Sequence, residues 1–415
     1  MCGGSSRHGV LASEQGSIRG PELSSSGSAG ISAEPPLRLR VLHIASGDGW
    51  GGAERMLSVL LEGMVAEESL DIEVLLLNEG RLADVVRDLG VRVHVICEER
   101  RSFGELVWAV RRWIAGRDFD VIHAHRYKEI IITVLSMVPR IRRLVVTVHG
   151  LEPWTQFSTR ERLLAWGPIV LARLYGAWFV GVSEEIAGRL ARCVGKSRVV
   201  KIPNPMPPIK CGESVDIRAR FGWDTRRPVV GFIGRLEEIK GPDYFLDVAL
   251  RSREDAGFIL IGTGSMKADL LARVRLDSLG DRVGFLGEVP DATGCLRQLD
   301  VLAVTSRHEG LPMVLLEAVA CEVPVVAFDV GGVRDVLDSS PAARLVPAGD
   351  VEGFHKAVDE MVRDRDGARM AATSWARSVQ ARFSVSRTVS SYLALYGGCT
   401  VHPQRSLPSE SVRRM

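Results

Sequence analysis

Residues 229–250 read VVGFIGRLEEIKGPDYFLDVAL. The apolar run from Val229 to Gly234 is typical of a buried parallel strand, and a helical pattern follows from Asp243 to Leu250. Arg235 and Lys240 therefore lie at the carboxyl end of a strand, where open α/β sheets bind ligands. The planar guanidinium of Arg235 and the ammonium of Lys240, near one helix start, favour the binding of a diphosphate. Either cation alone would more simply be a solvated surface charge.

The stretch EGLPMVLLEA places Glu309 on a loop and Glu317 inside the helix that follows. The fixed φ and missing N–H of Pro312 suit the first helical position, so we expect the helix to begin there. Free N–H groups at a helix start attract anions, which makes Gly310 and Leu311 candidate phosphate-binding residues. The alternative is a surface helix with two solvated glutamates.

Strand and helix patterns alternate along most of the chain, which predicts parallel, doubly wound sheets. Repeated proline in Pro203–Pro208 marks a linker between two such domains. The predicted strands are Leu39–Ile44, Ile72–Leu77, Val91–Ile96, Val121–His125, Leu144–His149 and Phe179–Val182, then runs near Val229, Phe258, Val283, Val301, Val325 and Ala343. The predicted division is a disordered extension or misassigned start (1–37), a first Rossmann-like domain (38–205), a second (206–385), a helix crossing back to the first (386–397) and a flexible tail (398–415).

Several segments, in chain order, resemble the retaining family 4 glycosyltransferases, which have the GT-B fold. The residues that carry the likeness are Gly234-Arg235 with Lys240-Gly241, and Glu309 with Glu317. Further segments that fit are GWGGAER (49–55), VVTVHG (145–150), VGVS (180–183), IPNP (202–205), LIGTG (260–264), VGFLG (283–287) and VGG (330–332). The resemblance covers roughly residues 38 to 397 and implies two Rossmann-like domains facing across a cleft, the first for an acceptor and the second for a nucleotide-sugar donor.

The resemblance also implies roles for individual residues. Glu309 would bind a hydroxyl of the donor sugar, Glu317 the ribose hydroxyls, and His149 the sugar from the acceptor-side domain without acting as a general base. Cations and amides directed at the departing diphosphate would stabilise its negative charge, so no divalent metal and no cofactor is predicted. The catalytic candidates are Glu309, His149, Arg235 and Lys240, and the donor-binding candidates are Gly51, Gly52, Gly234, Arg235, Lys240, Gly262, Gly264, Phe285, Gly310, Leu311 and Glu317.

Two positions depart from the common family pattern. Gly-Leu-Pro follows Glu309 where many members have Gly-Phe-Gly, so Pro312 lacks one amide, and Asp335 stands where glutamate is more usual. A second interpretation is a non-catalytic GT-B partner subunit, which the intact charged residues disfavour. A third is a nicotinamide-dependent oxidoreductase, but the loop Gly47–Gly52 lacks the G-x-G-x-x-G fingerprint and its acidic partner.

Composition is that of an ordinary globular protein large enough for two domains, with 415 residues, 46% hydrophobic and 25% charged. A net charge of +2 argues against nucleic acid as a partner. Seven cysteines without a C-x-x-C pair indicate reduced thiols and a cytoplasmic setting. The pair His123 and His125 has no carboxylate or thiol at ligand spacing, so we expect it to pack in the fold rather than bind metal.

The acceptor side is basic and aromatic. From Arg126 to Arg173 there are eight Lys/Arg against three acids, with Trp154, Phe157 and Trp166 among them, and Phe103–Ile114 places tryptophans beside arginines. Such surfaces can adhere to anionic lipid headgroups, although an ordinary solvated helix face explains them as well. The resulting hypothesis is a peripheral enzyme on the inner membrane face with a carbohydrate or lipid-linked acceptor, acting in cell-envelope or extracellular polysaccharide or glycolipid synthesis.

Overall fold

The computed structural model describes residues 38–137, 141–150, 159–209, 215–289 and 292–398. The predicted extension 1–37, the tail from 399 and the aromatic residues Trp154 and Phe157 lie outside the described residues.

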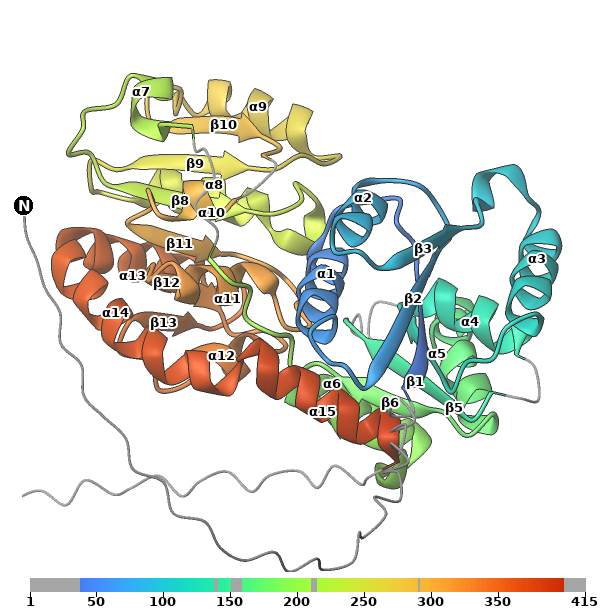
Figure 1. Ribbon diagram of the computed structural model, residues 1–415. Helices are drawn as coiled ribbons and strands as arrows, with labels where there is room; N and C mark the ends of the chain where they lie inside the picture. The colour runs from blue at the N-terminus through green and yellow to red at the C-terminus, as the bar shows by residue number, and fades with distance from the viewer. Residues whose placement is uncertain (1–37, 138–140, 151–158, 210–214, 290–291, 399–415) are drawn as a thin grey trace, which may run out of the picture. The chain divides into compact units, whose positions relative to one another are not determined.

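The first half of the chain forms a seven-stranded parallel sheet in the order β3-β2-β1-β4-β5-β6-β7 (Figure 1). Its strands are β1 Leu39–Ala45, β2 Leu70–Leu76, β3 Arg92–Val95, β4 Val121–His125, β5 Arg143–Val148, β6 Trp178–Gly181 and β7 Val199–Lys201. The first six match predicted strands to within two residues at each end, whereas the three-residue β7 was not predicted as a strand.

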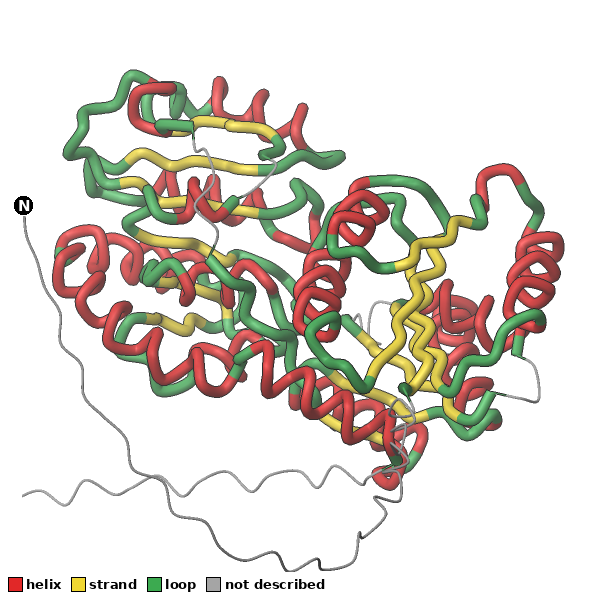
Figure 2. The backbone as a smooth tube through the Cα atoms, viewed as in Figure 1, coloured by secondary structure: helices red, strands yellow, loops and turns green. Residues whose placement is uncertain are grey.

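The second half forms a six-stranded parallel sheet in the order β10-β9-β8-β11-β12-β13. Its strands are β8 Val229–Ile233, β9 Gly257–Ile261, β10 Val283–Gly287, β11 Val301–Val304, β12 Val325–Phe328 and β13 Ala343–Val346, as predicted. Figure 2 shows the strands of each sheet running side by side. Two Rossmann-like sheets, each reversing strand order beside its first strand, confirm the predicted fold class.

Helices follow most of the strands, as the doubly wound arrangement requires. They are α1 Gly52–Met64, α2 Arg81–Asp88, α3 Phe103–Ala115, α4 Tyr127–Ser136, α5 Thr159–Leu174, α6 Glu184–Val194, α7 Ile217–Phe221, α8 Pro242–Arg251, α9 Lys267–Leu276, α10 Thr293–Leu296, α11 Met313–Ala320, α12 Val333–Leu337, α13 Val351–Arg363, α14 Arg365–Arg382 and α15 Val385–Gly397. None of the described helices has both the length and the hydrophobicity needed to cross a bilayer.

The core consists of the inward faces of these strands and helices. Strand residues such as Val41, Ile122, Val230 and Ile259 are fully buried, because parallel strands are covered on both faces. Trp166 on α5 is also buried, which corrects the prediction that it belongs to an aromatic surface. The apolar face of α5 places this ring inside, and the spacing of aromatic and basic residues in the sequence could not reveal that.

The C-terminal helix α15 lies against the first sheet. The hydroxyl of Tyr392 is 3.1 Å from Thr147 Oγ1, and the hydroxyl of Tyr396 is 2.7 Å from His123 Nδ1. Arg143 on β5 donates hydrogen bonds to the carbonyl oxygens of Leu395 and Tyr396. The last helix therefore covers the buried polar side chains of β4 and β5.

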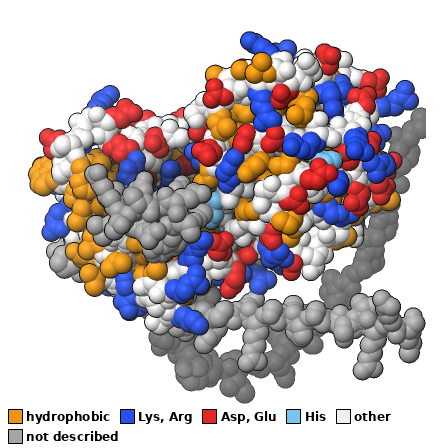
Figure 3. All heavy atoms as spheres, turned by 180° about the vertical axis from the view of Figure 1, so that it is seen from behind, with side chains coloured by type: hydrophobic (Ala, Val, Ile, Leu, Met, Phe, Trp, Pro, Cys, Tyr) orange, Lys and Arg blue, Asp and Glu red, His pale blue; other side chains and the backbone are white. Residues whose placement is uncertain are grey.

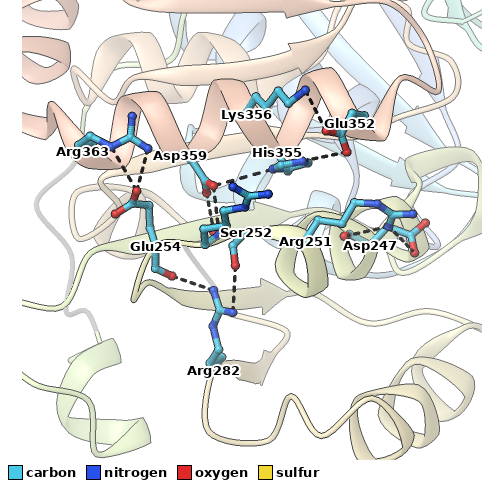
Figure 4. A network of polar contacts seen from close by, with 11 residues as sticks. Asp247, Arg251, Ser252, Glu254, Arg282, Glu352, His355, Lys356, Asp359 and Arg363 are labelled. Carbon is cyan, nitrogen blue, oxygen red and sulfur yellow. Dashed lines mark hydrogen bonds and ion pairs between the residues drawn. The ribbon is translucent and has the colours of Figure 1, made fainter.

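A polar network joins α13 to the end of α8 in the second half of the chain (Figure 4). Asp359 accepts hydrogen bonds from Ser252 Oγ at 2.6 Å and from the backbone N–H of Arg253 at 3.1 Å. Arg282 donates to the carbonyl oxygens of Ser252 and Glu254. These contacts fix the loop between α8 and β9 and leave the opposite ends of the strands available for a site.

Candidate functional site

The residues predicted to act lie at the carboxyl ends of strands, at the reversal of strand order or one strand away from it. In the first sheet, the loop after β1 leads to Gly51, and β5 ends just before His149. In the second sheet, β8 ends just before Gly234, and β11 leads to Glu309. Carboxyl ends of neighbouring parallel strands share one edge, so each sheet brings its own candidates together.

Lys240 and Glu309 form an ion pair. The Lys240 Nζ lies 2.7 Å from Glu309 Oε1 and 2.8 Å from Oε2, and Ser306 Oγ donates to Oε1 at 2.6 Å. The Glu309 side chain is 7% exposed and that of Lys240 26% exposed. The buried carboxylate therefore has two partners, the Lys240 ammonium and the Ser306 hydroxyl, whose three contacts hold its orientation.

The backbone around Gly241 explains why Lys240 reaches this position. Gly241 has φ +64, and a Cβ at this residue would lie 2.1 Å from the carbonyl oxygen of Thr305. Only glycine permits this close approach of the turn after β8 to the end of β11. The turn then passes directly into α8, with Pro242 as its first residue.

Arg235 does not join this pair. Its side chain is exposed, and within the described residues no hydrogen bond or ion pair to Glu309 or Glu317 forms. The pKa of the Glu237 carboxyl is lowered by hydrogen bonds from Ser265 and, to a lesser degree, by the nearby Arg235. Arg235 is therefore an exposed cation at the end of β8. It is five residues from Lys240 in the sequence, but it does not contact the Lys240–Glu309 pair.

The start of α11 differs by one residue from the prediction. Pro312 has φ −69 and ψ 127, so it is the N-cap, and the first helical residue is Met313. The pyrrolidine ring fixes φ only, and extended ψ values are equally compatible with proline. In the described part of the chain, the backbone N–H groups of Gly310, Leu311 and Met313 donate to no acceptor.

Gly310 brings the two halves of the chain into contact. A Cβ at Gly310 would lie 1.7 Å from the carbonyl oxygen of His149 and 3.3 Å from Ile186. Close by, the Asn204 amide donates to the carbonyl oxygen of Leu311 at 2.8 Å. His149 and the free N–H groups before α11 are thus neighbours, although they come from different sheets.

The glycine-rich loop after β1 approaches the same helix. Gly51 donates its N–H to Glu54 at 3.0 Å, and a Cβ at Gly52 would lie 3.9 Å from Met313. One turn further along α1, Arg55 Nε donates to Glu317 Oε1 at 3.1 Å. The Arg55–Glu317 pair could not be predicted from the sequence, because the two residues are 262 positions apart.

Asp335 also links the halves. It accepts a hydrogen bond from the backbone N–H of Glu184 at 2.8 Å and lies 3.4 Å from Lys201 Nζ. Asp335, which stands where glutamate is more usual, therefore caps the start of α6 and has Lys201 as a partner of opposite charge.

The remaining glycine candidates contact other backbone. A Cβ at Gly262 would lie 2.0 Å from the carbonyl oxygen of Gly234, and one at Gly264 would lie 2.4 Å from that of Leu236. Their small size permits the loops after β8 and β9 to touch, and their contact with a nucleotide stays a prediction. Phe285 is half-buried on β10, at the edge of the second sheet.

His149 stands at the end of a row of imidazoles in which His43 and His125 are buried, and this row was not predicted from the sequence. His43 Nδ1 lies 3.1 Å from His125 Nε2, and His125 Nδ1 lies 3.3 Å from His149 Nε2. Burial, followed by the charge of Arg126, lowers the pKa of His149 to about 3. Burial likewise lowers the pKa of His43 to about 3 and that of His125 well below its ordinary value. At neutral pH these rings are uncharged.

Three histidines in the described residues, His43, His123 and His125, have ring nitrogens within 4.8 Å of one another. His123 uses Nδ1 with the Tyr396 hydroxyl and Nε2 with Thr147 Oγ1, both at 2.7 Å. No carboxylate or thiolate belongs to the group. With both nitrogens of His123 engaged, the three rings do not form a ligand set in this arrangement.

Comparison with known proteins identifies the family. The sequence profile described as "Glycosyltransferase Family 4" matches residues 50–208, and the profile "Glycosyl transferases group 1" matches residues 227–364. A 2-deoxystreptamine glucosyltransferase of Streptomyces kanamyceticus is 30% identical over 285 residues, which cover 63% of this chain and 71% of that protein.

Two further relatives are also named as sugar transferases. A 2-deoxystreptamine N-acetyl-D-glucosaminyltransferase of Streptomyces fradiae is 28% identical, covering 67% of this chain and 72% of that protein. A phosphatidyl-myo-inositol mannosyltransferase of Mycobacterium leprae is 27% identical, covering 61% and 67%.

Among solved structures, the fold resembles that of Anabaena Alr3699/HepE in complex with UDP-glucose. The TM-score is 0.77 and the identity 20%, covering 87% of this chain and all of that one. Together with the two parallel sheets, these matches place the chain among the group 1, family 4 glycosyltransferases with the GT-B fold.

Proposed function

We propose that this glycosyltransferase moves a hexosyl group from a nucleoside diphosphate sugar to an acceptor hydroxyl, with retention of anomeric configuration and without a divalent metal. The main support for a donor site here is the Lys240–Glu309 ion pair. It lies in the same segment as the backbone N–H groups of Gly310, Leu311 and Met313, which donate no hydrogen bond within the described residues. Positive charge and free amides at a helix start suit a diphosphate.

Breaking the bond from the anomeric carbon to phosphate builds positive charge on the sugar and negative charge on the leaving diphosphate. The exposed guanidinium of Arg235, the Lys240 ammonium and the amides before α11 would stabilise that negative charge without a metal ion. Glu309 would keep one oxygen on Lys240 and offer the other to a hydroxyl of the donor sugar. Glu317 would bind the ribose hydroxyls while sharing its carboxylate with Arg55.

Retention of configuration needs no protein base on the acceptor side if the departing phosphate accepts the proton of the acceptor. His149 fits such a mechanism, because its depressed pKa keeps the ring neutral and a poor proton acceptor. Its place beside Gly310 suits contact with the transferred sugar.

For the acceptor, we propose a polyol carbohydrate or a lipid-linked sugar of the cell envelope or an extracellular polysaccharide or glycolipid. Two relatives carry 2-deoxystreptamine in their names and one carries phosphatidyl-myo-inositol. The proposed place of action is the cytoplasm, at the inner membrane face.

An exposed apolar and basic surface supports a membrane location. On α3, Phe103 is 55% and Trp108 61% exposed, and Arg112 lies over the Trp108 ring at 5.4 Å. Helix α3 packs on α4, which packs on α5, and Leu135 on α4 and Leu174 on α5 are also exposed. Figure 3 shows hydrophobic and basic side chains beside one another at the left of that view. Such a surface fits anionic lipid headgroups.

The test of the enzymatic proposal is a hydrolysis and transfer assay across a panel of nucleoside diphosphate sugars, in buffer with EDTA and again with Mg²⁺. We expect release of one nucleoside diphosphate at the same rate under both conditions, and NMR of the product should show the donor's anomeric configuration. Inverted configuration, or activity that requires Mg²⁺, would refute the corresponding part. Absence of any turnover across the panel would favour a non-catalytic partner subunit.

The test of the membrane proposal is sedimentation with vesicles of anionic or neutral phospholipid. Trp108→Ser combined with Arg112→Ser should weaken binding to anionic vesicles about fivefold or more, because each basic residue near such a surface contributes about 1 kcal/mol. Leu276→Ser is the matched control, since Leu276 on α9 is 83% exposed in the other half of the chain. Equal sedimentation of all three proteins with both vesicle types would contradict the proposal.

A further inference from the structure

The three histidine rings of this row, His43, His125 and His149, are linked through the same pair of ring nitrogens at each step. His43 lies on β1, His125 ends β4 and His149 follows β5. The Nδ1 of each ring faces the Nε2 of the next, at 3.1 Å between His43 and His125 and at 3.3 Å between His125 and His149. The register of the parallel strands, which pairs β1 with β4 and β4 with β5, sets these rings side by side.

A neutral imidazole carries one N–H and one acceptor nitrogen. If His125 donates from Nδ1, it must accept at Nε2, so the donor direction is the same at both links of the row. Two arrangements follow. In one, His43 and His125 donate from Nδ1 and His149 carries its N–H on Nδ1; in the other, every N–H is on Nε2.

The far end of the row distinguishes the two arrangements. His43 Nε2 is buried and has no hydrogen-bond partner among the described residues. A buried N–H without an acceptor is rarer in proteins than a buried acceptor without a donor. The first arrangement leaves only a lone pair unsatisfied at His43 Nε2, whereas the second would leave an N–H there. The first is therefore favoured, and it places the N–H of His149 on Nδ1.

Neighbouring groups do not compete for this row. His123, whose ring centroid lies 4.2 Å from that of His125, has its own partners in Tyr396 and Thr147. Arg126 contributes positive charge near His149, which opposes a second proton on that ring. Of the three rings in the row, only His149 is partly exposed, and its Nδ1 has no partner among the described residues.

We propose that His43 and His125 are positioning residues that hold the proton of His149 on Nδ1, so that His149 meets the bound sugar as a fixed hydrogen-bond donor. The proposal rests on the proposed function for the identity of the substrate, but the tautomer itself is a property of the free protein. With Nδ1 carrying the proton and Nε2 bound to His125, His149 has no lone pair to offer a reacting hydroxyl. The row would thus both supply an N–H and prevent proton abstraction by this ring.

The direct test is a long-range ¹H–¹⁵N spectrum of the full protein labelled with ¹⁵N-histidine, recorded without substrate, with His149 and His125 assigned from single variants. We expect His149 and His125 as Nδ1–H tautomers that do not titrate between pH 5 and 8. His355 is an internal reference, because its Nε2 lies 3.0 Å from Glu352 and should carry the proton. A wild-type spectrum with His149 as the Nε2–H tautomer, or as a cation at neutral pH, would overturn the proposal.

Variants of His125 separate positioning from packing. His125→Asn places an amide near the former Nδ1 and can still donate to His149, whereas His125→Leu cannot. We expect His125→Leu to change the His149 tautomer and to lower kcat by about tenfold or more with a smaller change in the donor KM, and His125→Asn to restore much of both. An unchanged tautomer and kcat in His125→Leu would overturn the proposal.

If neither variant folds, the wild-type spectrum alone decides the question. Stoichiometric zinc in the purified protein that is lost in His43→Asn would also overturn it, because a metal would then fix the rings. Failure of the proposed function is distinguishable, since it would appear as absent turnover with the wild-type tautomer still as predicted.

Discussion

Replacing Lys240 with methionine removes the charge of the central ion pair but keeps most of the side-chain length. Glu309 would retain the hydrogen bond from Ser306 at 2.6 Å and lose both contacts to Lys240, at 2.7 and 2.8 Å. Removing one partner of a fully buried pair costs about 3–5 kcal/mol, whereas exposed pairs contribute about 0–1 kcal/mol. Because Glu309 is 7% and Lys240 26% exposed, we expect a loss of about 2 kcal/mol in the free energy of unfolding.

The effect on catalysis should be separate from the effect on stability. Loss of a preorganised cation at the departing diphosphate should lower kcat/KM at least tenfold, equivalent to about 1.4 kcal/mol. Glu309→Ala should lose at least as much. A double-mutant cycle of Lys240→Met with Glu309→Gln should give a coupling of about 1 kcal/mol or more, since the two side chains touch.

Urea unfolding measures the stability change, and donor hydrolysis measures the catalytic one. The matched control is Lys356→Met, because Lys356 pairs with Glu352 on α13 at 2.9 Å while both side chains are more than half exposed. That variant should change stability by about 0.5 kcal/mol or less and leave turnover as in the wild type. A Lys240→Met protein with wild-type turnover would refute the assigned role, even if it were less stable.

Further predictions concern packing, pH and the membrane surface. Gly310→Ala would place a Cβ 1.7 Å from the carbonyl oxygen of His149, so we expect a loss of about 1–3 kcal/mol in urea unfolding and at least tenfold in turnover, with Gly280→Ala, where a Cβ meets nothing within 4 Å, as the control. Burial lowers the pKa of His43 and His149 to about 3, so the unfolded chain binds protons that the native state does not as pH falls below about 6.5. Each such group should lower the free energy of unfolding by about 1.4 kcal/mol per pH unit down to about pH 3, which urea midpoints at pH 7 and pH 5 would show, and equal midpoints would contradict. Trp108→Ser alone should reduce sedimentation with anionic vesicles but not turnover on a soluble acceptor.

The proximity of Lys240 and Glu309 could be predicted from sequence because both follow buried strand patterns. One comes after β8 and the other after β11, and these strands are neighbours at the reversal of strand order. The carboxyl ends of adjacent parallel strands must meet, whatever the details of the turns. The same reasoning did not place Arg235 correctly. Its side chain is exposed to solvent at the end of β8 and does not contact Glu309 or Glu317.

The contacts that the sequence could not predict depend on register or on distance along the chain. His123 and His125 are two residues apart on β4, so their side chains lie on the same face of the sheet. Only the pairing of β1 with β4 places His43 next to them. Arg55 and Glu317 come from helices in different halves. β7, three residues long, is too short for a periodic pattern.

The most direct test of the donor site is a crystal structure of the protein with the nucleoside diphosphate that the hydrolysis panel selects. The proposed site predicts diphosphate oxygens about 3 Å from the N–H of Leu311 or Met313 and from the Lys240 ammonium or the Arg235 guanidinium. A nucleotide bound elsewhere, with the start of α11 empty and the Lys240–Glu309 pair unchanged, would contradict it.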